Sequence, residues 1–377
     1  MAKIYIIAGE ASGDRLGADL MRALGLMSPD VEFVGIGGAE MTAAGLTSLY
    51  PMEELSVMGL VEVIKHYPRL KRRLNETVQD IIDHRPDVVL TIDSPDFCLR
   101  VARQVKEKLG VKTIHYVSPS IWAWRPKRAE KLKGVIDHVM TLLPFEPAYL
   151  HKEGIAATHV GHPLAHTPIY SDAQIEATLA RYDLRSAPLL FLPGSRRSEV
   201  MRLLPHFLQV DAHFAKAGLC TALISTPAMA PVIREECRKA GASIAIIDHA
   251  TRMEKEQLFQ SAQAALAASG TVTLELAAAR TPMVVAYDMS WLTMRIMRYM
   301  ALIDTVTLVN IITQTRIVPE FLGPQCRAQN IIPALDALLS DPQYMDAALD
   351  QTMQALGRDD SPPPQRAAHV VLDVLRS

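Results

Sequence analysis

The residues with the clearest chemical potential are Ser269, Gly270 and Thr271, which follow the apolar run Ala264–Ala268. That run is typical of a buried strand, and a helix is expected to begin near Val272. A strand that leads into a helix N-terminus presents unpaired backbone N–H groups and a positive partial charge, and glycine lets a ligand approach the backbone. The pattern predicts a phosphate site, although an ordinary βαβ unit capped by Ser269 or Thr271 would share it.

Glu275 lies one helical turn beyond this loop, where its carboxylate could accept hydrogen bonds from ribose hydroxyls. A second strand-to-helix turn, PGSRRSE, begins at Pro193 after an apolar strand that ends at Leu192. Its backbone N–H groups, with Ser195 and Arg196, could hold a pyrophosphate and neutralise a leaving group. A solvated helix start with surface arginines is the alternative. Two such turns in one half of the chain favour a nucleotide diphosphate as ligand.

Carboxylates follow strands in the other half of the chain, at Glu10, Asp14, Asp93 and Asp96. One of them could take the proton from an attacking sugar hydroxyl, as an inverting transfer requires. Asp14 and Asp96 are equally plausible as helix N-caps, whereas Asp93 stands at the strand terminus itself. The sequence contains no HExxH motif, metal-ligand cluster or Asp-x-Asp pair, so neither a metal nor a cofactor is expected.

Strands that alternate with helices must position these residues. Strands are expected at 3–8, 31–35, 87–92, 112–117, 139–143 and 157–160, and again at 188–192, 222–225, 243–247, 264–268 and 283–286. This alternation predicts an α/β protein with parallel, doubly wound sheets, whose ligands bind at the carboxyl ends of strands. We expect two Rossmann-like domains that face each other across a cleft, at 1–165 and 166–360, and a final helix within 361–377 that covers a domain or crosses back.

Composition narrows the class of protein. The chain has 377 residues, about half of them hydrophobic, and a formal charge of −2, so it can build two cores and is not a bulk nucleic-acid binder. Its four cysteines have no CxxC spacing, which favours reduced thiols in a cytoplasmic protein. The chain opens directly on a predicted strand, without a signal peptide, and no apolar run is long enough to span a bilayer. Any membrane contact is therefore expected to be peripheral.

Two stretches are candidates for lipid contact. The apolar segment 57–64 runs into the basic segment 65–73, and methionines and aromatic residues at 291–300 are interleaved with Arg295 and Arg298. Such sequences are typical of interfacial helices or acyl-chain grooves. Buried core with arginines that reach to the surface explains each stretch at least as well when taken singly. One such stretch in each half of the chain favours a lipid substrate.

Taken together, these motifs resemble the lipid-A-disaccharide synthase family, inverting glycosyltransferases of the GT-B fold. The resemblance covers most of the chain and is carried by AGEASGD at 8–14, GIGG at 35–38, MGLVEV at 58–63, IDSPDF at 92–97, YVSPSIWAWRPKR at 116–128, LPFE at 143–146, VGHPL at 160–164, LPGSR at 192–196 and ASGT at 268–271. It implies transfer of 2,3-diacylglucosamine from its UDP derivative to the 6-hydroxyl of 2,3-diacylglucosamine 1-phosphate. The enzyme would act at the cytoplasmic face of the inner membrane, and a homodimer is possible.

The resemblance also implies roles for individual residues. Asp93 matches the essential aspartate, expected to be the general base, and Glu10 lies in the matching first-strand loop. Arg196 matches the arginine on the donor pyrophosphate, and Glu275 matches the ribose ligand. Asn310 matches a motif asparagine in the cleft, and Glu10 and Asn310 are expected to join Asp93 among the catalytic residues. Ser195 belongs to the LPGSR motif, and Ser269, Gly270 and Thr271 match the phosphate loop.

Other functions remain open from the residues alone. A UDP-N-acetylglucosamine 2-epimerase or a GT-B transferase for another lipid-linked acceptor would use the same nucleotide turns, and a lipid-binding protein without activity would share the apolar stretches. Cys98 and the VPEFLG stretch at 318–323 depart from the family pattern, which bears on acyl-chain and acceptor details.

Overall fold

The computed structural model describes the chain except for residues 1, 56–59, 121, 123–125 and 289–303, and the side chains of 60–67 and 126–128 are also outside the description. The chain divides into two compact units. The first comprises Met1–Pro163 together with Asp359–Ser377, and the second comprises Leu164–Arg358. The last segment of the chain therefore belongs to the first unit.

The first unit contains a parallel sheet in the order β2-β1-β3-β4-β5-β6. Its strands are β1 (Lys3–Ala8), β2 (Glu32–Ile36), β3 (Val88–Ile92), β4 (Lys112–Tyr116), β5 (His138–Thr141) and β6 (Ala157–His159). The helices are α1 (Ala11–Met27), α2 (Ala39–Ala43), α3 (Leu60–His84), α4 (Pro95–Leu109), α6 (Glu146–Lys152) and α16 (Pro363–Arg376), with short 3-10 turns η1 (Met52–Glu54), η2 (Pro126–Lys131) and η3 (Pro163–His166).

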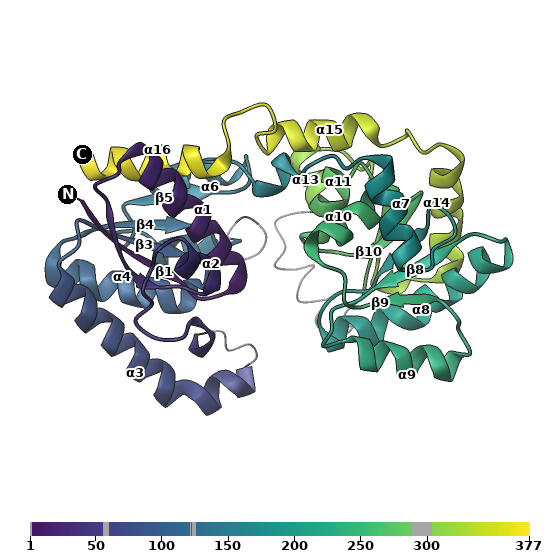
Figure 1. Ribbon diagram of the computed structural model, residues 1–377, viewed down its shortest axis with the longest axis horizontal. Coiled ribbons are helices and arrows are strands. Elements are labelled where there is room, and N and C mark those ends of the chain that lie inside the picture. The colour runs from purple at the N-terminus through teal and green to yellow at the C-terminus, as the bar shows by residue number, and fades with distance from the viewer. Residues whose placement is uncertain (1, 56–59, 121, 123–125, 289–303) are drawn as a thin grey trace. The chain divides into compact units, whose positions relative to one another are not determined.

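Both faces of this sheet are buried, because successive residues of each strand point to opposite faces and helices cover each face. Ile4 and Ile6 of β1 pack with residues of α1 and α16 on one face. Tyr5 and Ile7 pack with residues of α3 and α4 on the other. Figure 1 shows α16 beside α1, and the apolar side chains of α16 complete that face of the core.

The second unit contains a parallel sheet in the order β12-β11-β10-β7-β8-β9. Its strands are β7 (Leu189–Leu192), β8 (Thr221–Ile224), β9 (Ala245–Ile247), β10 (Ala264–Ala268), β11 (Met283–Tyr287) and β12 (Glu320–Leu322). Its helices are α7 (Asp172–Arg181), α8 (Arg197–Lys216), α9 (Ala230–Ala240), α10 (Arg252–Ser261), α11 (Val272–Ala278), α13 (Leu308–Thr313), α14 (Ala328–Ser340) and α15 (Asp346–Ala355), and η4 (Gly323–Gln325) follows β12. The prediction of parallel α/β sheets is confirmed, and β12 is a strand that the sequence did not reveal.

Strand order decides where each unit can bind a ligand. In the second sheet the chain begins at β7 and continues to β8 on one side, then returns to β10 on the other. In the first sheet β1 lies between β2 and β3, so the order reverses between β1 and β3. Loops diverge at such switch points and leave a crevice at the carboxyl ends of the strands. The turn that contains Glu10 and the turn that contains Asp93 follow β1 and β3, and the two predicted phosphate turns follow β7 and β10.

One local expectation was wrong. Asp14 was a plausible N-cap of the helix that follows it, but α1 already begins at Ala11, with Glu10 as its N-cap residue. Asp14 is therefore helical, and its side chain is buried and accepts hydrogen bonds from the backbone N–H groups of Gly38, Glu40 and Met41 at 2.7, 2.9 and 3.1 Å. These donors lie at the start of α2, so Asp14 caps a different helix from its own.

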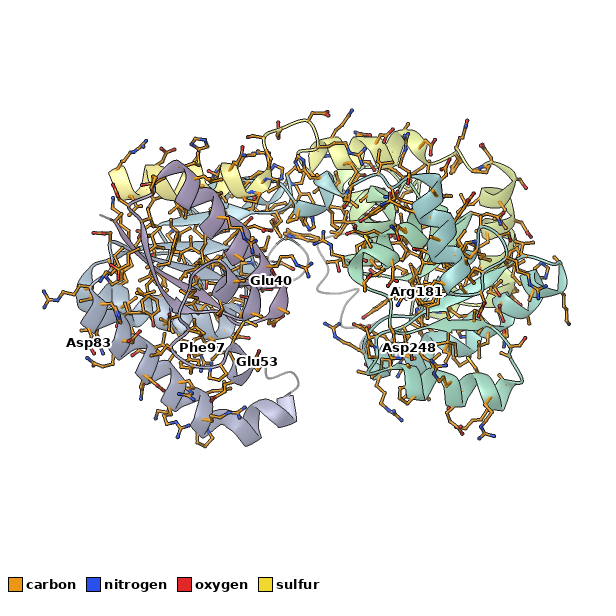
Figure 2. All side chains as sticks on the ribbon, in the orientation of Figure 1. Glu40, Glu53, Asp83, Phe97, Arg181 and Asp248 are labelled. Carbon is orange, nitrogen blue, oxygen red and sulfur yellow. The ribbon has the colours of Figure 1, made fainter. Side chains whose placement is uncertain are left out.

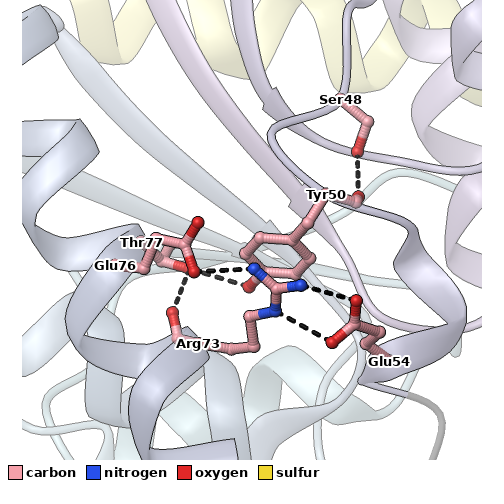
Figure 3. A network of polar contacts seen from close by, with 6 residues as sticks. All are labelled: Ser48, Tyr50, Glu54, Arg73, Glu76 and Thr77. Carbon is pink, nitrogen blue, oxygen red and sulfur yellow. Dashed lines mark hydrogen bonds and ion pairs between the residues drawn. The ribbon is translucent and has the colours of Figure 1, made fainter. Parts of the chain in front are cut away.

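Arg73 joins α3 to the turn that precedes it (Figure 3). Its guanidinium donates two hydrogen bonds to Glu54, at 2.9 and 2.6 Å, and a third to Glu76 at 2.7 Å. The same group lies 4.4 Å from the ring centroid of Tyr50, whose hydroxyl is 2.8 Å from the hydroxyl of Thr77. Because Glu54 ends η1 and Arg73 lies within α3, the cluster fixes both ends of the segment between them. The apolar part of that segment, including 57–59, lies outside the described residues.

Candidate active site

The second unit has a cavity of about 840 Å³ at the carboxyl ends of its central strands. The residues predicted to bind a nucleotide diphosphate all line it: Ser195, Arg196, Ser269, Gly270, Thr271 and Glu275. They come from two turns far apart in the sequence, and the pairing of β7 with β10 brings these turns together. The register of the β7–β10 pair explains why the two turns lie together, because Leu192 at the end of β7 is paired with Ala267 near the end of β10.

Glycine is required where the two turns meet. Gly194 has a φ of 100°, and a Cβ atom at this position would lie 2.8 Å from Oε2 of Glu199 and 3.6 Å from Cβ of Ala268. A side chain here would thus be strained by the positive φ and would crowd the side chain of Glu199, whereas its contact with Ala268 would be an ordinary one. At Gly270, by contrast, an added Cβ atom would have no heavy atom within 4 Å, so the backbone faces open space. A ligand can approach the second turn closely.

Arg196 supplies a cation at the rim of the cavity. It precedes α8, its side chain is 72% exposed, and its Nη1 lies 3.0 Å from Oε1 of Glu199. An exposed ion pair of this kind contributes little stability and constrains the arginine only weakly. The guanidinium can therefore turn from Glu199 to an anionic ligand at small cost, and a phosphate accepts a bidentate contact from it.

Glu275 was expected to offer a free carboxylate, but Lys255 of α10 lies 2.5 Å from its Oε2. Both side chains are about one-third exposed, and both line the cavity. The sequence did not identify Lys255 as a site residue, because its contact depends on how α10 packs against α11. The ion pair engages one oxygen of Glu275, and the carboxylate lines the cavity, where a ligand hydroxyl can reach it.

Polar residues after β8 and β9 extend the cavity and were also missed by the sequence reasoning. They are Ser225, Thr226, Asp248 and His249. Asp248, labelled in Figure 2, accepts a hydrogen bond from Arg234 at 2.8 Å, which lowers the pKa of its carboxyl group. The hydroxyl of Thr226 is buried without a hydrogen-bond partner. The position of these residues after strand ends was the signal that could have identified them.

Asn310 does not line this cavity. It is fully buried on α13, where its Nδ2 donates to the carbonyl oxygen of Val318 at 2.9 Å and its Oδ1 accepts from the N–H of Val318 at 3.0 Å. Both ends of the amide group are thus engaged within the chain. This geometry gives Asn310 a positioning contact, whereas the family resemblance implied a place among the reacting groups.

Glu10 and Asp93 meet at the switch point of the first sheet. A Cβ atom added to Gly9 would lie 2.5 Å from Oγ of Ser94, so the two turns are in close contact. Burial raises the pKa of Glu10, and the negative charge of Asp93 raises it further. Glu10 and Asp93 are therefore electrostatic neighbours at this switch point.

The backbone at Asp93 is unusual. Asp93 and Ser94 have φ values of 53° and 44°, a left-handed conformation that costs free energy in residues other than glycine. The N–H of Asp93 donates to the carbonyl oxygen of Tyr116 at 2.9 Å, and Oδ1 of Asp93 accepts from the N–H of Ser94 at 2.8 Å. These two hydrogen bonds hold the strained turn, and with it the Asp93 carboxylate, at the end of β3. Strained backbone of this kind clusters at functional sites.

Parts of the two stretches predicted to contact lipid lie outside the described residues, namely 57–59, 291–300 and the side chains of 60–67. No helix of the described chain is long and apolar enough to cross a membrane. Within the same residues, no cluster of three or more His, Cys, Asp or Glu side chains could hold a metal ion.

Solved structures share this fold. UDP-GlcNAc 2-epimerase from Neisseria meningitidis, solved with UDP-GlcNAc bound, aligns over 100% of this chain and 100% of its own with a TM-score of 0.65 and 12% identity. A glycosyltransferase from Rickettsia africae aligns over 100% of this chain and 99% of its own with a TM-score of 0.64 and 12% identity. At such identity the likeness shows the fold alone. The protein is of the GT-B type, with two Rossmann-like units.

Sequence comparison identifies the family. The model of the lipid-A-disaccharide synthetase family matches residues 4–367. The lipid-A-disaccharide synthase of Ruegeria pomeroyi is 48% identical, over 100% of this chain and 96% of its own length. The chain belongs to this family and is a glycosyltransferase of lipid A biosynthesis. The 2-epimerase alternative rested on the shared fold and does not outweigh this match.

Proposed function

We propose that the chain transfers 2,3-diacylglucosamine from UDP-2,3-diacylglucosamine to the 6-hydroxyl of 2,3-diacylglucosamine 1-phosphate. The products are the β-1,6-linked disaccharide 1-phosphate and UDP. The main support for binding of the UDP donor is that all six residues predicted to bind the nucleotide line one cavity of the second unit. Membership of the lipid-A-disaccharide synthetase family supports the proposed identity of the acceptor and the presence of acyl chains on both substrates.

The second unit binds the donor in this proposal. The backbone N–H groups of the two turns, which contain Ser195, Ser269, Gly270 and Thr271, hold the diphosphate. Arg196 turns from Glu199 to the β-phosphate and stabilises the negative charge that develops as UDP leaves. Glu275, held by Lys255, accepts hydrogen bonds from the ribose hydroxyls.

The first unit binds the acceptor, and Asp93 is its general base. The Asp93 carboxylate takes the proton of the acceptor 6-hydroxyl as this oxygen attacks the anomeric carbon, and the bond from that carbon to the UDP oxygen breaks on the opposite face. Inversion of the anomeric centre gives the β linkage. Glu10, next to Asp93, orients the attacking hydroxyl. Asn310 acts indirectly, by holding the segment that ends at Val318.

Because both proposed substrates carry acyl chains, the enzyme is expected to act at a lipid surface. We propose that the enzyme is cytoplasmic and associates peripherally with the inner membrane through the apolar and basic segments 57–73 and 291–300, with a homodimer as a possible assembly. Sedimentation with vesicles of phosphatidylethanolamine and phosphatidylglycerol tests this. Binding should weaken as salt rises, because basic side chains contribute electrostatic attraction that salt screens. Binding that is indifferent to salt would contradict it.

Product analysis tests the reaction. The full chain is given both diacylated substrates, and disaccharide 1-phosphate and UDP are measured by mass spectrometry. Asp93→Asn should lower turnover by about 10²–10⁴-fold, the usual contribution of a general base. Asp96→Asn, an exposed carboxylate in the first turn of α4, is the matched control and should remain close to wild type. Near-normal turnover of a folded Asp93→Asn variant would refute the assignment.

Donor binding is measured separately, as UDP affinity by calorimetry. Arg196→Ala should weaken UDP binding by about 10–100-fold, the range expected for a lost charge-assisted hydrogen bond. Arg197→Ala removes the neighbouring exposed arginine, which does not line the cavity, and should have a much smaller effect. Equal effects of the two substitutions would mean that only general charge matters.

A further inference from the structure

The phosphate turn after β10 is attached to a second segment of the same unit. Oγ of Ser269 donates a hydrogen bond to the carbonyl oxygen of Val306 at 3.0 Å. Val306 precedes α13, for which Thr307 is the N-cap residue. The position of the turn therefore depends on the position of residues 305–307.

Glu320 is the acceptor that organises residues 305–307. Its Oε1 lies 2.5 Å from Oγ1 of Thr305, 3.1 Å from the backbone nitrogen of Val306 and 2.7 Å from that of Thr307. Consecutive N–H groups at the start of a helix lack intrahelical partners, and a carboxylate satisfies them with charge-assisted hydrogen bonds. Oε1 is also 3.3 Å from Nδ2 of Asn310, so a fourth donor from α13 points to the same oxygen.

Glu320 is itself held by the sheet. It is the first residue of β12, and it pairs with Val285 of β11. β11 in turn pairs with β10, the strand that leads into Ser269. Asn310 also connects α13 to β12, because its amide group forms hydrogen bonds with Val318, just before β12, and with Glu320. The carboxylate thus links a rigid sheet edge to a segment that contacts the phosphate turn.

We propose that Glu320 is a positioning residue for donor binding. Through Val306 it fixes the hydroxyl of Ser269 and so keeps the backbone of Ser269–Thr271 in the conformation that receives the diphosphate. The role rests on the proposed donor site in the second unit. It accounts for the buried place of Asn310, which holds the same carboxylate rather than the substrate.

A double-mutant cycle on UDP affinity tests this role. Glu320→Gln keeps the shape of the side chain but removes its charge and places an NH₂ group near the donors. We expect UDP binding to weaken by about tenfold, the factor for one charge-assisted hydrogen bond. Ser269→Ala should weaken it comparably. Both changes break the same connection between Glu320 and Ser269. The double variant should therefore bind UDP no more weakly than the single variant with the lower affinity, as expected for coupled residues.

The control is Asp350→Asn. Asp350 accepts a hydrogen bond from Arg280 at 2.6 Å and does not line the donor cavity, so its replacement should leave UDP affinity unchanged. Unchanged UDP affinity in Glu320→Gln, or effects of Glu320→Gln and Ser269→Ala that simply add, would overturn the proposal. Thermal melting establishes that each variant is folded.

The donor site is judged by a different variant. If Arg196→Ala leaves UDP affinity unchanged, the donor site itself is misassigned; if it weakens binding while Glu320→Gln does not, only the role of Glu320 fails. Should Glu320→Gln not fold, Thr305→Val replaces it in the cycle, because it removes one donor to Glu320 and retains the carboxylate. A smaller loss of affinity, again not additive with Ser269→Ala, is then expected, and full additivity refutes the proposal.

Discussion

Replacing Glu146 by glutamine should make the stability of the first unit less dependent on pH. Glu146 begins α6 and is only 4% exposed. Its Oε1 accepts from Nε1 of Trp122 and its Oε2 accepts from the N–H of Leu143, each at 3.1 Å. Burial raises the pKa of this carboxyl group from 4.5 to about 7, because these hydrogen bonds do not replace the lost hydration.

The magnitude follows from this pKa difference. Below the unfolded pKa of Glu146 both states are protonated, so the group imposes no cost. As the pH rises towards about 7, the unfolded chain ionises while the folded protein retains its proton, and the free energy of unfolding falls. Each pKa unit corresponds to about 1.4 kcal/mol, so the loss reaches about 3 kcal/mol and then levels off.

The glutamine variant lacks this titration. Its carbonyl oxygen can still accept from Trp122, but its NH₂ group faces the N–H of Leu143, which costs about 1–3 kcal/mol at every pH. The variant should therefore be less stable than wild type at about pH 5, and the difference should shift in its favour by about 2–3 kcal/mol at about pH 8.

Hydrogen exchange of amides in β4 and β5 measures this difference, because variant and wild type are compared at the same pH and in the unit that contains Glu146. Glu153→Gln, an exposed glutamate at the end of α6, is the control and should show no such shift. A stability difference between Glu146→Gln and wild type that stays constant across this range would show that Glu146 is not a buried carboxyl group with a raised pKa.

Four further substitutions probe the geometry of the first unit. Gly9→Ala should reduce turnover strongly, because the added Cβ atom would lie 2.5 Å from Oγ of Ser94 and displace the strained turn. At Gly25, by contrast, an added Cβ atom would have no heavy atom within 4 Å. Gly25→Ala should therefore raise stability by about 0.5–1 kcal/mol in thermal melting. Asp14→Ala should cost about 1–3 kcal/mol in denaturant unfolding, because three backbone N–H groups at the start of α2 lose their acceptor; a cost below about 0.5 kcal/mol would contradict this capping role. Arg73→Lys should lower stability by about 1–2 kcal/mol, because lysine cannot reproduce the bidentate contact; unchanged melting would show that charge alone is sufficient.

Most of the candidate donor site could be read from the sequence. The turns at Gly194 and Gly270 each follow an apolar strand and precede a helix, and this local pattern is strong enough to locate them. The strand Ala264–Ala268 and the helix from Val272 are confirmed at the predicted positions. Lys255 could not be found in this way, since a lysine on an amphipathic helix is commonplace until its partner across the packing interface is known.

The short strand β12 illustrates a second limit. It has only the residues Glu320–Leu322, and it begins with a glutamate that has little intrinsic preference for a strand. Its pairing with β11 defines it as a strand, and that pairing is long-range. The same reason explains why the hydrogen bonds of Glu320 were not foreseen.

The sequence by itself determined the alternation of strands and helices, the family and the types of residue at the strand ends, because these depend on local periodicity and short motifs. Only the tertiary structure decided which strand ends are neighbours. Parallel pairing places β10 beside β7 and β3 beside β1, so turns separated by about 75 and about 85 residues meet at two switch points. Long-range packing likewise places Asp14 at the start of α2, where it caps that helix, and buries Asn310, whose amide group bonds to Val318. Burial and hydrogen-bond partners are properties of the folded chain.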